Sequence, residues 1–125
     1  MGNKNPEQLS PEIMRQFTGS EHWYRHAINR KIVFTDGAKH VADHGGAYWL
    51  LDEIALNQRY NSRVSAEQFQ VWTLKADVLK HTGILTCEDG NGNKVFEKAL
   101  EFTDFPLPEI TLWFTDNTIL LPSEY

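Results

Sequence analysis

The stretch from Ile84 to Thr103 constrains the fold most, because it predicts a β-hairpin. Two runs of β-favouring residues, Ile84–Glu88 and Lys94–Thr103, are joined by Asp89–Asn93, which contains only Asp, Gly and Asn. Residues of these types tolerate the positive φ angles that tight hairpin turns require. At least one antiparallel pair of strands is therefore expected in the C-terminal half of the chain.

Further segments extend this predicted sheet. Phe69–Ala76 is rich in β-forming residues, and Ile110–Thr115 and Thr118–Leu121 flank Asp116-Asn117, which is a second turn signal. The sequence therefore predicts an antiparallel sheet that begins at about Phe69 and continues to the C-terminus.

Three helices are predicted before the sheet, near residues 11–18, 36–43 and 47–60. Ser10 and Pro11 suit the N-cap and the first helical position, and Glu12 suits the first turn. The third helix has one almost entirely apolar face, which consists of Ala47, Leu50, Leu51, Ile54 and Gln58. Residues 21–27 fit either a strand or a helical turn, and Lys31–Phe34 favours a strand.

This order of elements predicts an α+β fold, in which the N-terminal helices pack on one face of a C-terminal antiparallel meander sheet. The length fits a single domain over residues 1–125, with 1–9 as a flexible N-terminal tail. No apolar run approaches the roughly 18–20 residues of a membrane span. Cys87 is the sole cysteine, so no internal disulfide can form, and we expect a cytoplasmic protein without a membrane partner.

Acidic residues outnumber basic residues by 17 to 12, which gives a net charge of −5. From Ile84 onward there are eight acidic residues and only two basic ones, Lys94 and Lys98. Non-specific binders of nucleic acid use clusters of Lys and Arg, so we expect no nucleic-acid partner. Packing explains Trp72 and Trp113 better than base stacking does, and the two are predicted to share one face of the sheet. Trp23 and Tyr24 fit either interpretation, because Arg25, Arg30 and Lys31 are close by.

Six phrases of the sequence follow one another in an order typical of a known family. They are Phe34–Gly37, Gly46–Ile54, Phe69–Leu74, Leu85–Asn93, Thr103–Leu107 and Leu120–Tyr125. In these phrases the chain resembles a family of small bacterial proteins of unknown function, often encoded on plasmids and other mobile elements. The resemblance covers most of the chain beyond Phe17. It implies a cytoplasmic accessory protein of bacterial mobile DNA, and it brings no accepted activity and no catalytic residues.

Two pairs of histidines carry the main chemical hypothesis. Within each pair the residues are four apart, which places both on one face of a helix or a strand. With two nearby aspartates they make six candidate metal ligands: His22, His26, His40, His44, Asp36 and Asp43. Zn²⁺ prefers about four such ligands, and one pair of histidines supplies only two of them. The leading prediction is therefore no metal, no cofactor and no catalytic residue.

Two groups of residues are candidates for binding a protein partner. The first is acidic and could mimic nucleic-acid phosphate in a basic groove of the partner; it consists of Glu97, Glu101, Asp104 and Glu109. The second is Ile119 and Leu120 in the last predicted strand. At an edge of the sheet, this strand would pair across a two-fold axis to form a homodimer, or accept a strand from a target.

The leading functional prediction is a non-enzymatic, protein-binding accessory or regulatory protein of a bacterial mobile element, with inhibition of a host system as one such role. The alternative is a small enzyme or metal-binding protein built around the four histidines. Distance separates the two hypotheses, because the alternative needs at least three of these histidines, together with Asp36 or Asp43, in one pocket.

Overall fold

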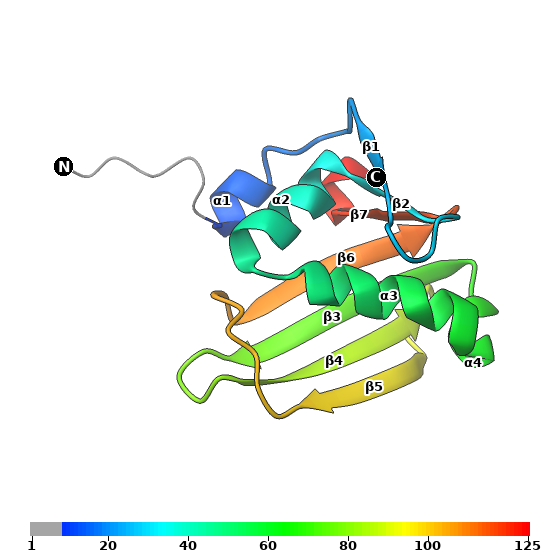
Figure 1. Ribbon diagram of the computed structural model, residues 1–125. Helices are drawn as coiled ribbons and strands as arrows, with labels where there is room; N and C mark the ends of the chain where they lie inside the picture. Colours follow the sequence, from blue (N-terminus) through cyan, green and yellow to red (C-terminus); the bar gives the residue numbers. More distant parts are fainter. Residues whose placement is uncertain (1–8) are drawn as a thin grey trace.

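A seven-stranded sheet forms the centre of the computed structural model, which describes residues 9–125 (Figure 1). The strands are β1 (Trp23–Arg25), β2 (Val33–Thr35), β3 (Phe69–Asp77), β4 (Thr82–Asp89), β5 (Lys94–Leu100), β6 (Glu109–Thr115) and β7 (Thr118–Leu120). Their order across the sheet is β1-β2-β7-β6-β3-β4-β5. Neighbouring strands are antiparallel, except that β2 and β7 are parallel. The helices are α1 (Pro11–Met14), α2 (Asp36–Gly45), α3 (Tyr48–Tyr60), α4 (Ser62–Ser65) and the 3-10 turn η1 (Pro122–Glu124).

Both predicted hairpins are confirmed. β4 and β5 pair around a turn in which the Asp89 carboxylate accepts hydrogen bonds from the backbone N–H groups of Asn91 (2.8 Å) and Asn93 (2.9 Å). β6 and β7 are joined by Asp116 and Asn117, whose φ angles of 52° and 56° lie in the left-handed region. Asp and Asn adopt this region more readily than other residues with a side chain, so the turn residues determine where each strand reverses.

The prediction of a simple meander is wrong. β3 lies between β4 and β6, so the chain leaves β5 at one edge and returns to the middle of the sheet through residues 101–108. The N-terminal strands β1 and β2 then complete the sheet, and Phe34 of β2 pairs with Ile119 of β7. Strands of three residues are too short to show a pattern of period two, which is why the sequence left residues 21–27 undecided.

Two of the three predicted helices are present with small shifts, and the first is shorter than predicted. α2 begins where the Thr35 hydroxyl accepts a hydrogen bond from the N–H of Ala38 (3.2 Å), and it ends at Gly46, whose φ is 61°. α3 buries much of its predicted apolar face. α1 is a single turn that ends at Met14 instead of near residue 18. α4, another single turn, has no counterpart in the sequence prediction.

Burial alternates along the central strands and divides the sheet into an inner face and an open face. Trp72 and Leu74 of β3 are buried, whereas Val71 and Thr73 between them are half-buried. The buried side chains share one hydrophobic core with Ile54 of α3. In Figure 1, α2 and α3 lie in front of the sheet. The open face, by contrast, carries residues that are half-buried or exposed: Val71, Thr73, Lys75, Ile84, Thr86, Glu88, Glu97, Glu109, Thr111 and Trp113.

Trp72 and Trp113 lie on opposite faces of the sheet, contrary to the prediction. Trp113 pairs with Val71, the neighbour of Trp72, so its ring lies on the open face. There the Trp113 ring packs against Phe69, with ring centroids 5.1 Å apart, and against Tyr125, at 5.4 Å. A shift of one residue in strand register exchanges the two faces, and pairing between distant segments decides that register.

Over residues 9–125, none of the helices is long and apolar enough to cross a membrane. The predicted N-terminal tail, residues 1–9, lies outside the described residues except for Leu9. Leu9 is buried and belongs to the hydrophobic core, so it is not part of a flexible tail.

Candidate functional site

A groove of about 500 Å³ beside α2 gathers many of the candidate residues. Its lining comprises Gln16, Phe17, Thr18, Gly19, Glu21, Tyr24, Asp36, Lys39, His40, Asp43 and His44. The last five of these belong to α2, where residues three and four apart share one face of the helix. Four of the six candidate metal ligands therefore line one groove: Asp36, His40, Asp43 and His44.

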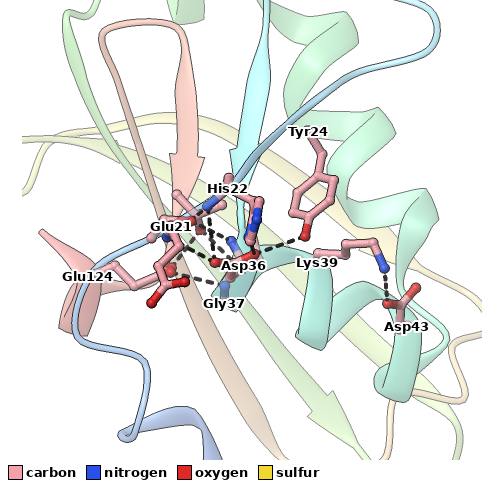
Figure 2. A network of polar contacts seen from close by, with 11 residues as sticks. Glu21, His22, Tyr24, Asp36, Gly37, Lys39, Asp43 and Glu124 are labelled. Atoms are coloured by element: carbon pink, nitrogen blue, oxygen red, sulfur yellow. Dashed lines mark hydrogen bonds and ion pairs between the residues drawn. The ribbon is translucent and has the colours of Figure 1, made fainter.

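Asp36 connects the segment before β1 to the first turn of α2 (Figure 2). Its carboxylate accepts hydrogen bonds from the Tyr24 hydroxyl (2.9 Å) and from the backbone N–H groups of Glu21 (3.1 Å) and His22 (3.3 Å). Burial alone would raise the pKa of Asp36, but these hydrogen bonds outweigh burial and hold the pKa below its ordinary value. Because its oxygens are occupied in this way, Asp36 organises the wall of the groove.

Lys39 and Asp43 form an ion pair one helical turn further along, also drawn in Figure 2. The Lys39 ammonium lies 2.7 Å from the Asp43 carboxylate, which also accepts a hydrogen bond from the Tyr48 hydroxyl. The hydrogen bond to Asp43 raises the pKa of Lys39. Burial acts to raise the pKa of Asp43, but the donors Lys39 and Tyr48 keep it below its ordinary value. The two charges therefore neutralise each other within α2.

His40 and His44 stack beside this pair, with ring centroids 4.4 Å apart, and Phe17 lies 5.2 Å from the His40 ring. In the described part of the chain, Nε2 of His40 is buried and has no hydrogen-bond partner. Burial and the adjacent His44 lower the pKa of His40, while Asp43 acts in the opposite direction. The imidazole of His40 is therefore neutral at pH 7 and presents an uncommitted nitrogen.

The lowered pKa of His40 predicts a loss of stability in acid. Below its ordinary value of 6.5, the unfolded chain binds a proton at His40 that the folded protein does not, so the free energy of unfolding falls as the pH decreases through this range. The loss is complete once the pH is below the lowered pKa of the folded state. Replacing His40 with Phe should flatten this part of the stability curve, measured by urea denaturation between pH 7.5 and 5. The control Gln16→Phe adds a ring at the groove and keeps the histidine; an equal slope in both variants would contradict the prediction.

The four histidines do not converge on one pocket. His22 is exposed, and its Nδ1 lies 3.8 Å from Asp36, outside the lining of the groove. His26 is buried elsewhere, with Nε2 at 2.8 Å from the Asp52 carboxylate. Among the described residues, no group of three His, Cys, Asp or Glu side chains could hold a metal ion. The condition set for the enzyme or metal hypothesis, three histidines in one pocket, is not met in this structure.

His26 belongs instead to a polar connection that the sequence does not reveal. Its Nδ1 accepts hydrogen bonds from the backbone N–H groups of Ile28 (3.2 Å) and Asn29 (3.0 Å), which places the ring proton on the Nε2 that faces Asp52. The Asn29 amide donates to the carbonyl of Ala55 in α3 (2.9 Å). These contacts fasten the β1–β2 connection to α3, so His26 has a structural role.

Cys87 is not placed for nucleophilic chemistry. Its side chain is buried on the inner face of β4. Burial, with additional contributions from Glu67, Glu88 and Asp89, raises the pKa of Cys87 to about 12. Because the thiolate is the reactive form of cysteine, this thiol is inert at neutral pH.

Ile119 and Leu120, the apolar candidates for partner binding, are not accessible to a partner. They are exposed to only 0% and 7%, because β7 lies between β2 and β6 in the interior of the sheet. Edge pairing through β7, either in a homodimer or with a target strand, therefore does not fit the structure. The two edges of the sheet are β1 and β5.

The four acidic candidates are all exposed. Glu97 is in β5 and Glu109 is the first residue of β6. Glu101 and Asp104 lie in the connection between these strands. Three of the four acidic residues, Glu101, Asp104 and Glu109, therefore lie in or at the end of a single connection.

Beside these acidic residues the structure places an exposed apolar patch, here called the apolar tip: Val78, Leu79 and Phe102. Their exposed fractions are 40%, 92% and 69%. Val78 and Leu79 are in the β3–β4 turn, and Phe102 follows β5. The His81 carbonyl accepts a hydrogen bond from the N–H of Thr103 (2.7 Å), and the His81 ring stacks on Phe102 at 5.8 Å, so the two connections lie together. Figure 1 shows both connections at one end of the sheet.

Sequence reasoning missed the apolar tip. Its members come from two connections that are far apart in the chain, and only folding brings them together. The one available signal was Val78-Leu79, an apolar pair inside a turn, where polar residues are the norm.

Comparisons with known proteins show a family and no activity. The model of a family described as "Family of unknown function (DUF6876)" matches residues 8–125. A search of curated proteins and a search of solved structures each returned no match.

Proposed function

We propose that this chain, which belongs to the family of unknown function DUF6876, is a non-enzymatic, protein-binding accessory or regulatory protein of a bacterial mobile element. It acts in the cytoplasm and binds its protein partner through the apolar tip. Inhibition of a host system is one role that such binding can serve. The resemblance of six sequence phrases to plasmid-encoded proteins supports the mobile-element context.

The observation that carries this proposal is the exposure of the apolar tip. Leu79 is exposed to 92% and Phe102 to 69%, which leaves two large apolar side chains in water at the same end of the sheet. Exposed apolar patches with a polar rim are typical of protein interaction sites. Around Phe102 the rim is acidic, because Glu101 and Asp104 flank it in the chain and Glu109 begins the next strand, whereas the exposed Lys80 beside Leu79 is basic.

Site-specific photo-crosslinking in the bacterial host tests the proposal. A benzophenone amino acid at position 79 should form a discrete covalent adduct with a protein, identified by mass spectrometry. The matched control carries the same group at Tyr60, which is exposed to 76% at the end of α3, at the opposite end of the sheet from the β3–β4 turn in Figure 1. No adduct from position 79, or the same adduct from both positions, would contradict binding through the tip.

The second candidate function is a small enzyme or metal-binding protein that uses the groove beside α2. One observation favours it: the unpartnered Nε2 of His40 in a groove that also contains His44 and two carboxylates. Against it, Asp36 and Asp43 are already occupied by hydrogen-bond donors within the protein. This function therefore ranks below protein binding.

Metal analysis separates the two functions. Because two imidazoles fall short of the four ligands that Zn²⁺ prefers, we expect purified protein to contain less than about 0.1 equivalent of zinc per chain by mass spectrometry of the metal. Addition of a chelator should leave its melting temperature unchanged. Zinc near one equivalent per chain, lost in the double variant His40→Ala, His44→Ala, would reverse the ranking.

A further inference from the structure

We propose that the partner supplies a basic, extended segment that adds as a further strand to the edge of the sheet at β5, an inference that rests on the proposed protein-binding function. β5 is an edge strand of seven residues, whereas the other edge, β1, has only three. An edge strand presents unpaired backbone N–H and C=O groups, which are the groups that an added strand uses. The length of β5 makes it the edge that can hold a segment in register.

The position of β5 connects this edge to the apolar tip. β5 ends at Leu100, and Phe102 of the tip follows two residues later. One end of a strand that pairs along β5 therefore reaches the apolar tip. There its apolar side chains can cover Phe102 and Leu79, while its backbone pairs with the edge.

Charge at the C-terminal end of β5 favours a basic segment, because Glu101 and Asp104 are exposed there; within the strand, two lysines, Lys94 and Lys98, accompany one glutamate, Glu97. Glu97 faces the open side of the strand, opposite Thr86, and Glu101 follows the end of the strand. Lys94 forms an ion pair with Glu97, but both side chains are about half exposed, so the pair contributes at most about 1 kcal/mol and a cation of the partner can replace Lys94. Lys98, the other cation of β5, is bound to Glu53 of α3 at 2.7 Å.

The same charges disfavour a second copy of this chain as the occupant. The regular part of β5 is Phe96–Leu100, because the pairing with β4 is irregular where Cys87 is followed by Glu88. If two copies of Phe96–Leu100 pair antiparallel about the central residue, Lys98 of one copy lies opposite Lys98 of the other. If the centre of the pairing moves to Glu97, Glu97 of one copy lies opposite Glu97 of the other. Like charges directly opposite each other destabilise a strand pair. A different protein with basic residues meets no such penalty.

Two synthetic peptides test the proposal: Leu-(Thr-Arg)4-Leu and Leu-(Pro-Arg)4-Leu. They have the same charge and the same ends, but proline removes every second N–H group that a strand ladder needs. By fluorescence anisotropy at low salt, we expect the threonine peptide to bind at least tenfold more tightly. Hydrogen exchange should show slower exchange of the amides of residues 94–100 in its presence.

The carboxylates are tested with matched double variants. Glu97→Gln with Glu101→Gln should weaken binding of the threonine peptide about tenfold, a change of about 1.4 kcal/mol. Glu12→Gln with Glu21→Gln makes the same charge change in and after α1 and should have little effect. Equal binding of both peptides, no binding of either, or no protection of β5 amides would overturn strand addition. A crosslink from position 79 in that case would leave protein binding through the tip intact.

Discussion

Replacing Gln70 with Leu is expected to lower the free energy of unfolding by about 3 kcal/mol, because each buried polar group that loses its partner costs about 1–3 kcal/mol. Gln70 is fully buried on the inner face of β3. Its Oε1 accepts hydrogen bonds from the Trp72 indole (2.9 Å) and the Gln58 amide (2.7 Å). Its Nε2 lies within hydrogen-bond distance of Gln58 Oε1 and of the carbonyls of Val64 and Glu67. Leucine fills a similar volume but leaves these groups unpaired.

Urea denaturation of Gln70→Leu and Gln68→Leu measures this effect with a matched control. Gln68 is exposed two residues earlier, so the same substitution there should change stability by less than about 0.5 kcal/mol. If the two variants were equally stable, the buried amide would contribute no more than an apolar side chain does. The hydrogen bonds of Gln70 would then not be needed to hold α4 against the sheet.

Replacing Glu124 with Ala is expected to cost about 2–3 kcal/mol, because its carboxylate satisfies three donors near the N-terminus of α2. It accepts hydrogen bonds from the Thr35 hydroxyl (2.6 Å), the Gly37 N–H (3.0 Å) and the Leu121 N–H (2.9 Å). The contact is close, since a Cβ added to Gly37 would lie 2.4 Å from Oε1 of Glu124. This one side chain therefore joins the C-terminal η1 to the start of α2.

Thermal denaturation of Glu124→Ala and Glu124→Gln separates hydrogen bonding from charge. The amide of glutamine keeps one acceptor oxygen but loses the negative charge at the positive end of the helix, so its loss should be smaller than that of alanine. Ser123→Ala, at the exposed neighbouring residue, should be close to wild type. Equal melting temperatures for all three variants would mean that η1 is not needed to hold α2.

Some features of this fold were predictable because they depend on neighbouring residues. The turn at Asp116-Asn117 needs two positive φ angles, which Asp and Asn supply without help from the rest of the protein. The buried face of α3 follows from the spacing of Leu50, Leu51 and Ile54. The first helix was overestimated, because a cap and a proline predict where a helix begins, not how far it continues.

The candidate sites were less predictable, because spacing along the chain does not determine distance in space. His40 and His44 share a helical face and do lie together, as their spacing implied. His22 and His26 have the same spacing but separate, since they flank the short strand β1 and do not share one regular element: His22 is exposed, and His26 is buried against Asp52. Glu101 and Asp104 border an apolar patch that forms only when the β3–β4 turn meets the connection after β5.

By itself, the sequence determined where the chain turns, which face of α3 is apolar, and that the C-terminal half forms strands. These properties depend on backbone angles and side-chain periodicity over a few residues. Only the tertiary structure decided that β7 lies inside the sheet, because β7 pairs with the distant strand β2, and that β5 lies at its edge, because β6 pairs with β3 and not with β5. It also decided that Phe102 meets the β3–β4 turn. Contacts between residues distant in the chain form only when the whole core assembles, and local patterns do not encode them.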